Sequence, residues 1–221
     1  MAITTHAQLL TAVSDYIGRR TDLGSVDDDF VVLAEARMNF GDYGGAFPTP
    51  PLRVRQMVSR DTLSPTSEYT TLPTTYLEAI SAKLTSSTPD KPLVALQMAT
   101  FDRECPSSSA GEPSYYAIVG TEMRIGPVQS CTIEFLNYRT IPPLASNDPN
   151  WLLTANPGVY LYGCLLEAAI YIDEVEDIAK YGNIYAGLMR GMQSSGSDSS
   201  IGKPIQAQSG IRLVQRGGIR Q

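Results

Sequence analysis

Candidate catalytic and metal-binding residues are few and widely separated in this sequence. His6 is the sole histidine of the 221 residues, and it lies close to the start of the chain, where a catalytic base is hard to hold rigidly. The three cysteines, Cys105, Cys131 and Cys164, are far apart and show no C-x-x-C spacing. The pattern disfavours a Ser–His–Asp triad, a Cys–His pair, a zinc site and a disulfide framework, and indicates reduced thiols.

Carboxylates provide the remaining candidates. Asp27, Asp28 and Asp29 are consecutive, and consecutive helical residues point to different faces, so stabilisation of a helix N-terminus is favoured over magnesium binding. Glu167 lies within an apolar stretch and could be a buried acid, but pairing with an arginine, within or between subunits, is the favoured interpretation. No phosphate-binding glycine motif occurs. The sequence therefore predicts no catalytic residue, no metal and no cofactor.

The charge of the chain is unevenly distributed. Hydrophobic residues make up 43% and charged residues 18%, which is typical of a soluble globular protein, and the net charge is −6. Arg53 and Arg55 are two residues apart and therefore lie on the same side of a predicted strand. This side is interpreted as the solvent-facing side of the strand or, alternatively, as a ridge that contacts phosphates. The N-terminus does not resemble a signal peptide, and no apolar run is long enough to span a membrane. We expect a soluble cytosolic product.

The end of the chain has a different character. Residues 193–200 are predicted to be a flexible linker, and no acidic residue follows Asp198. The arm beyond it is basic and apolar in turn, which indicates that it meets a different surface from the acidic body. Its candidate binding residues are Lys203, Ile211, Arg212, Leu213, Val214, Arg216 and Arg220.

Hydrophobic periodicity predicts where the elements lie. Helices are expected over 5–19 and from about 26 to 40, the second starting at a capping box of Ser25 and Asp28 and burying Phe30, Leu33, Ala34 and Met38. Residues 52–65 and 68–73 are predicted to be paired strands, and 77–85 a strand or short helix. A hairpin over 114–127 turns at Gly120 and Thr121, and 130–140 continues it.

Residues 150–172 predict a helix that is apolar on nearly all sides. Asn156 is the expected N-cap and Pro157 the first helical residue. One face carries Leu161, Cys164, Leu165, Ala168 and Ile172, and the other carries Tyr160, Gly163, Glu167 and Tyr171. A helix that is apolar on both faces must be covered on both. We expect the face with Tyr160 to pack partly against another copy of the chain.

The last helix is predicted to begin at a cap formed by Asp173 and Glu176. Its glycines, Gly182, Gly187 and Gly191, either permit close helix packing or are simply tolerated. The expected class is α+β: an α-helical bundle of two N-terminal helices (1–50) and two C-terminal helices (142–195), an inserted small antiparallel β unit (51–141), and a linker with an extended arm (196–221).

Four segments, in order, resemble the adaptor (head-completion) family of tailed bacteriophages. They are LRVRQM (52–57), LPTTYLEAI (72–80), PSYYAIVGTEMRIGP (113–127) and the most specific one, NYRTIPPLASNDPNWLLTANPGVYLYGCLLEAA (137–169). The resemblance covers most of residues 5–195. It implies a non-enzymatic protein of the virion neck that is assembled in the host cytoplasm. It also implies a homo-oligomeric ring, expected to be dodecameric, beneath the portal protein and above a tail or nozzle protein, with double-stranded DNA passing through its channel without sequence-specific binding.

Two other functions remain open on the residues alone. A tail-associated module could bind a peptide or glycan on exposed Tyr115, Tyr116 and Tyr138, although core packing explains these aromatics equally well. A carboxylate hydrolase would need two carboxylates across a cleft, and no spacing indicates such a pair.

Overall fold

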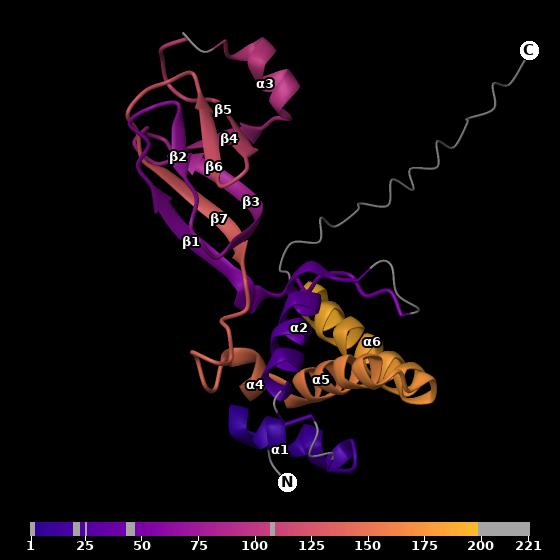
Figure 1. Cartoon of the computed structure of the whole chain (residues 1–221). Helices are drawn as coiled ribbons and strands as arrows, with labels where there is room; N and C mark the ends of the chain where they lie inside the picture. The colour runs from indigo at the N-terminus through magenta and orange to yellow at the C-terminus, as the bar shows by residue number, and fades with distance from the viewer. Residues whose placement is uncertain (1–2, 20–22, 25, 43–46, 107–108, 199–221) are drawn as a thin grey trace, which may run out of the picture.

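Two lobes joined at a narrow waist make up the protein (Figure 1). The computed structural model describes residues 3–19, 23–24, 26–42, 47–106 and 109–198. The helical lobe contains α1 (His6–Tyr16), α2 (Asp27–Phe40), α4 (Trp151–Ala155), α5 (Pro157–Ile172) and α6 (Val175–Asp198). The β lobe contains the 3-10 helix η1 (Arg55–Met57), β1 (Val58–Leu63), β2 (Tyr69–Thr71), β3 (Tyr76–Leu84), β4 (Lys91–Ala95), α3 (Met98–Glu104), β5 (Tyr115–Val119), β6 (Glu122–Gly126) and β7 (Ile133–Arg139). The α+β class is confirmed.

The sheet is large rather than the small antiparallel unit predicted from the sequence. Its seven strands follow the order β1-β7-β3-β4-β5-β6-β2 and curl around their own core. All neighbouring strands are antiparallel except β4 and β5, which run parallel with α3 as the crossover between them. The β lobe is therefore a folded body with its own apolar interior.

Strand positions follow the sequence pattern, but several pairings do not. The hairpin of β5 and β6 is confirmed, with Gly120 at a positive φ of 59° in its turn. Residues 77–85 form β3, but β2 pairs with β6 and not with β1. β7 does not continue the hairpin; it lies between β1 and β3, where Ile133 and Phe135 are fully buried. Alternation identifies a strand, whereas closure of the curled sheet decides its neighbours.

The predicted helix over 150–172 is two helices. Asn150, not Asn156, supplies the side-chain cap, because its Oδ1 accepts the N–H of Leu153 at 2.9 Å at the start of α4. Asn156 separates α4 from α5 and makes no capping side-chain bond. Pro157 opens α5 as expected, and its ring disfavours the helical conformation of the preceding residue, so the two helices meet at a break.

Other helix ends also differ from the prediction. α2 begins after Val26, which makes no side-chain cap, and Ser25 of the expected capping box lies outside the described residues. Asp173 does not open α6; it ends α5 in the left-handed conformation, with φ 63°. α6 continues to Asp198, so the first part of the expected linker is helical. In the described part of the chain, no helix is long and apolar enough to cross a membrane.

A polar clamp holds the two lobes together at the waist. The Arg53 guanidinium donates to Glu78 Oε2 of β3 (2.8 Å) and to the carbonyl of Asn39 in α2 (3.0 Å), and it lies 5.7 Å from the centre of the Tyr138 ring. The side chain of Asn39 accepts the N–H of Ile141 at 3.0 Å, just after β7. Arg53 and Arg55 are thus not neighbours on one side of a strand, because β1 begins only at Val58. Arg53 joins the lobes and is unavailable as part of a phosphate ridge.

Candidate functional site: the outer face of α2

α5 forms the centre of the helical lobe and is covered by its own chain. Tyr160 and Gly163, predicted to face another copy, are buried beneath α2 and α6. A Cβ added at Gly163 would lie 3.2 Å from Ala34 Cβ and 3.4 Å from Tyr185 Cε2, so three helices meet at this glycine. Tyr171 is the exposed member of the predicted face, and the centre of its ring lies 5.7 Å from that of Phe30 in an edge-to-face arrangement. The role of these residues between subunits stays a prediction.

A buried hydrogen-bond network surrounds Tyr160. Its hydroxyl donates to Glu35 Oε1 of α2 (2.9 Å) and accepts from Asn150 Nδ2 of the α4 cap (2.6 Å). The N–H of Leu144 donates to the same Glu35 oxygen at 2.8 Å. Burial raises the pKa of Glu35, although the two donated bonds oppose the shift, and burial also raises the pKa of Tyr160. The network fastens α2, α5 and the chain returning from β7, which is a structural role.

Glu167 pairs with an arginine, as the favoured interpretation predicts. Arg37 of α2 donates from Nε to Glu167 Oε1 at 2.6 Å, and its Nη1 pairs with Asp42. Burial lowers the pKa of Arg37, but the two carboxylates raise it more, so the net direction is upward. The cluster carries one cation and two anions. A role of Glu167 as a general acid is disfavoured, because its carboxylate is paired with Arg37, which is always charged.

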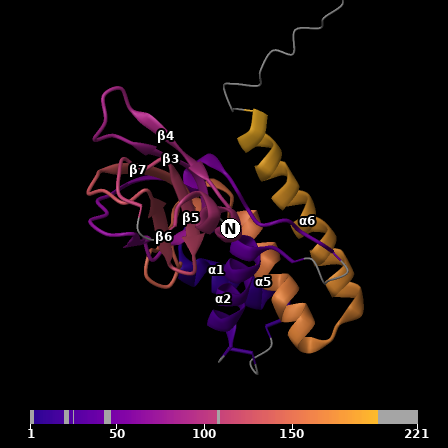
Figure 2. The same cartoon turned by 90° about the horizontal axis from the view of Figure 1, so that it is seen from above.

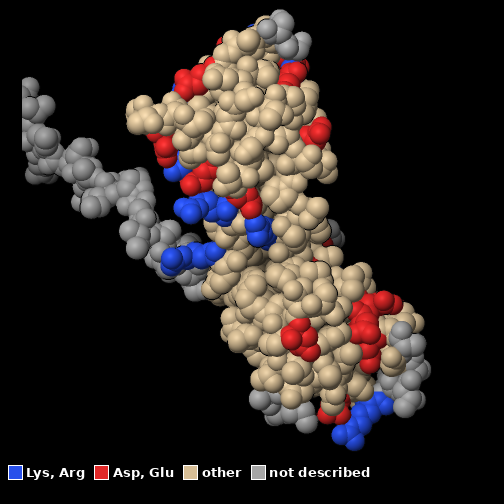
Figure 3. All heavy atoms as spheres, turned by 90° about the vertical axis from the view of Figure 1, so that its left-hand side faces the viewer, with Lys and Arg blue, Asp and Glu red and all other residues tan. Residues whose placement is uncertain are grey.

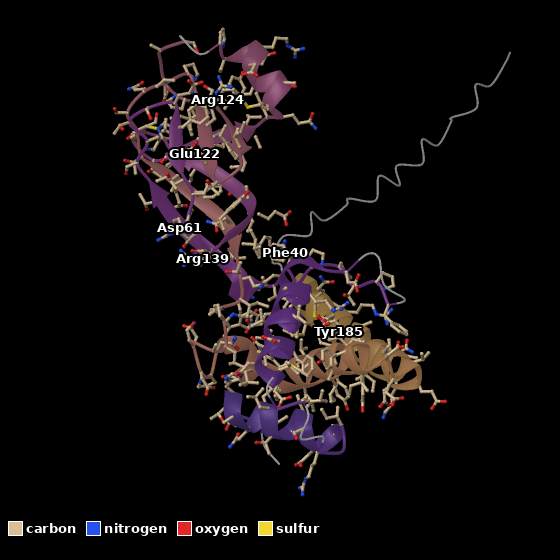
Figure 4. The ribbon with its side chains drawn as sticks, in the orientation of Figure 1. Phe40, Asp61, Glu122, Arg124, Arg139 and Tyr185 are labelled. Atoms are coloured by element: carbon tan, nitrogen blue, oxygen red, sulfur yellow. The ribbon has the colours of Figure 1, made fainter. Side chains whose placement is uncertain are left out.

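Tyr185 of α6 borders this cluster from within the lobe. Its ring is fully buried, and burial raises the pKa of its hydroxyl. Among the described residues, that hydroxyl has no hydrogen-bond partner. Figure 4 shows Tyr185 inside the helical lobe and Phe40 at the end of α2 nearest the β lobe. The charged neighbours of Tyr185 are the ion-paired side chains of the Arg37 cluster. Because it is buried, Tyr185 contributes no reactive group to the outer surface.

The surplus apolar surface lies on α2. Val32, Leu33 and Phe40 are 59%, 51% and 64% exposed, and exposed Ala36 lies between them. This spacing places all four on one side of the helix, which we call the α2 stripe. Leu33 was expected in the core with Phe30, Ala34 and Met38, but α5 covers only the side that those three share. α2 is therefore the helix that is apolar on both faces.

A hollow of about 340 Å³ opens beside the α2 stripe. Its apolar wall is formed by Leu33, Ala36 and Phe40, and its polar floor by Arg37, Asp42 and Glu167, with Gly41 at the end of the helix. The charges of the floor are already paired with one another, so an entering group meets a largely apolar wall. This arrangement suits a side chain from another protein surface better than a reacting substrate.

The sequence contained a signal for this surface. Val32, Leu33, Ala36 and Phe40 recur at helical spacing on the side of α2 opposite Phe30, Ala34 and Met38. The predicted core face of α2 contains Leu33 together with Phe30, Ala34 and Met38 and therefore does not separate the two sets. The assignment of surplus apolar surface to α5 had the same origin, because composition shows how apolar a helix is but not which neighbours cover it.

The other candidates are structural or lie outside the described residues. Lys203, Ile211, Arg212, Leu213, Val214, Arg216 and Arg220 of the arm lie outside them. Tyr116 is buried in the β core, Tyr115 packs beside α3, and Tyr138 lies under Arg53. The three tyrosines therefore do not form the exposed aromatic surface that a peptide- or glycan-binding module would need. Within the described ranges no group of three or more His, Cys, Asp or Glu could hold a metal ion.

Charge also varies along the molecule. Figure 3 shows basic side chains gathered at the waist and acidic groups on both lobes. Arg60 of β1 pairs with Glu134 at 3.7 Å, and Arg139 of β7 pairs with Asp61, so part of this basic charge is neutralised by the β lobe itself. On the face that Figure 3 shows, the described residues therefore form no dense, unpaired basic track of the kind typical of tight nucleic-acid binding.

Comparison with known proteins agrees with the four ordered segments of the sequence. Residues 4–207, nearly the whole chain, match the family described as SU10 adaptor protein. No curated protein matches the chain. The match extends across both lobes and into the arm, so it covers the α2 stripe and the waist as well as the sheet. A structural rather than catalytic role agrees with the paired carboxylates and the apolar outer face of α2. The chain belongs to the SU10 adaptor protein family, and is a bacteriophage adaptor protein.

Proposed function

We propose that this adaptor forms a homo-oligomeric ring, expected to be dodecameric, that joins the portal protein to a tail or nozzle protein in the virion neck. The observation that carries the proposal is the α2 stripe. Three large apolar side chains stay exposed on a helix whose opposite face is already buried in the core of the helical lobe. A monomer gains nothing from such a surface, whereas an assembly covers it. Family membership supports binding to other virion proteins.

The arm supplies the second contact in this proposal. α6 ends at Asp198, and the sequence beyond it combines cations with apolar residues. Such a segment can order on a partner and add contact area from every subunit, and a ring of weak contacts gives high avidity. We assign it to the portal, with Lys203, Arg212, Arg216 and Arg220 as the charged contacts and Ile211, Leu213 and Val214 as the apolar ones.

DNA contact in this proposal is passive. The net charge of the whole chain is −6 although the arm carries four cations and no acidic residue, so the rest of the chain is more acidic still. Counterion release rewards basic surfaces, and an acidic channel wall therefore lets DNA slide without adhering. We expect the assembled ring to show no sequence-specific DNA binding.

The test combines the adaptor with the portal protein encoded by the same phage genome. Electron microscopy should show portal rings that carry an added collar. A chain cut after Asp198, which keeps α6 whole, should lose the collar. Two full-length variants separate the charged from the apolar contacts of the arm. One replaces Arg212, Arg216 and Arg220 by Ser, and the other replaces Ile211, Leu213 and Val214 by Ser. An adaptor that stays monomeric and ignores the portal at all concentrations would overturn the proposal.

A further inference from the structure

We infer that the α2 stripe is covered by α6 of the next copy of this chain, so that α2 and α6 are the two halves of one subunit contact. The inference rests on the proposed ring and names the surfaces that build it. Figure 2 shows α5 between α2 and α6, both of which contact α5 at Gly163. A contact between two different surfaces is heterologous, and its repetition generates a ring where the rotation closes.

The outer face of α6 has the shape that large apolar side chains require. Gly187 and Gly191 lie one helical turn apart, both are exposed, and a Cβ added at either would meet nothing within 4 Å. Glycine is less favourable than alanine inside a helix, so these two exposed glycines weaken α6. Their absent side chains leave open space on this side of α6, and exposed Ile184 lies one turn from Gly187. Leu33 and Phe40 project as the matching knobs on α2.

The third glycine of α6 shows what such a residue does in this fold. A Cβ added at Gly182 would overlap Cδ2 of Phe47, so the ring of Phe47 occupies the space that a side chain would fill. The absent side chain thus lets an aromatic ring of the same chain pack directly on the helix backbone. Gly187 and Gly191 offer the same kind of space on the outside, where within the described residues nothing fills it.

Charge favours this pairing over contact between two copies of α2. Asp28 and Asp29 are exposed at the start of α2, and Arg37, the cation of that helix, is taken by Glu167 and Asp42. Arg190 is the charged residue of α6 between Asn183 and Ser194. It forms no ion pair in the described part of the chain. In an α2–α6 contact, the acidic end of α2 therefore meets a cationic face. In an α2–α2 contact, it would meet a second acidic helix end, which is unfavourable.

Cysteine cross-linking tests the contact directly. Leu33→Cys and Gly187→Cys are made in separate chains that also carry Cys131→Ser, because Cys131 is partly exposed whereas Cys105 and Cys164 are buried. The two chains are mixed, assembled at high concentration and on the portal, and treated with a mild oxidant. A disulfide forms only where the Cα atoms approach to about 4.4–6.8 Å. We expect covalent dimers from the mixture, and higher ladders when one chain carries both cysteines.

Controls distinguish the other occupants of the stripe. Each single variant alone should give no dimer, and Leu33→Cys mixed with Val94→Cys, which is exposed on β4, should give none. Dimers from Leu33→Cys alone would show a symmetric α2–α2 contact and overturn the inference. Rings seen by electron microscopy without cross-linked dimers would also overturn it, with the stripe assigned to the portal or tail protein and the proposed ring intact. Absence of both rings and portal binding would instead reject the proposed function.

Discussion

Arg37 and Glu167 join α2 to α5 through an ion pair of 2.6 Å beside the hollow on the outer surface. The pair lies on the boundary between the core face of α2 and the α2 stripe. It therefore fixes the position of the stripe relative to α5, and a change at either residue should affect folding before it affects assembly.

We expect Glu167→Gln to lower the free energy of unfolding by about 1–3 kcal/mol, because Arg37 keeps Asp42 but loses a buried charged partner. Arg37→Met should cost at least as much, since it leaves both carboxylates without their cation. Urea denaturation measures both, and the double variant gives the coupling energy. Lys180→Ala, which breaks the exposed pair with Asp177, is the matched control and should cost less than about 0.5 kcal/mol.

The pH dependence of stability should report Glu35. Burial raises the pKa of this carboxyl in the folded state, so the folded chain holds its proton more tightly than the unfolded chain does. The contribution is fully present below the unfolded value of about 4.3 and is lost as pH rises through the folded pKa. Wild type should therefore lose stability relative to Glu35→Gln as the pH rises above about 4.3. A constant difference across that range would contradict the role of burial.

Two glycines of α6 should respond in opposite directions to the same substitution. Gly182→Ala pushes a methyl group into the ring of Phe47 and should destabilise the subunit by about 1–3 kcal/mol. Gly187→Ala faces open space in the subunit and should stabilise it by up to about 1 kcal/mol. Chemical denaturation of the monomer measures both. If both variants were equally destabilised, the packing of Phe47 on Gly182 would not be the cause.

The α2 stripe should separate folding from assembly. Leu33→Ser with Phe40→Ser removes exposed apolar side chains, so unfolding of the monomer should change by no more than about 0.5 kcal/mol. The ring fraction at a fixed concentration should fall by about tenfold or more, because contacts at the centre of an interface dominate its affinity. Sedimentation measures the ring fraction. Val94→Ser on β4 is the exposed control and should change neither quantity.

Much of the fold could be predicted because its signals are local. The β5–β6 hairpin required only alternation on both sides of Gly120, and the opening of α5 at Pro157 follows from the geometry of proline. The pairing of Glu167 with an arginine also followed, since a carboxylate in an apolar stretch needs a cation. That the cation is Arg37, distant in the sequence, could not be read from spacing.

Local pattern and motif order were sufficient to predict the α+β class, the positions of most helices and strands, the family, and an excess of apolar surface over what one core needs. The folded structure was needed to show that β7 lies between β1 and β3 and that the exposed apolar surface lies on α2 rather than α5. The physical reason is the same in both cases. Periodicity describes one element at a time, whereas strand neighbours and helix cover depend on contacts between segments far apart in the chain.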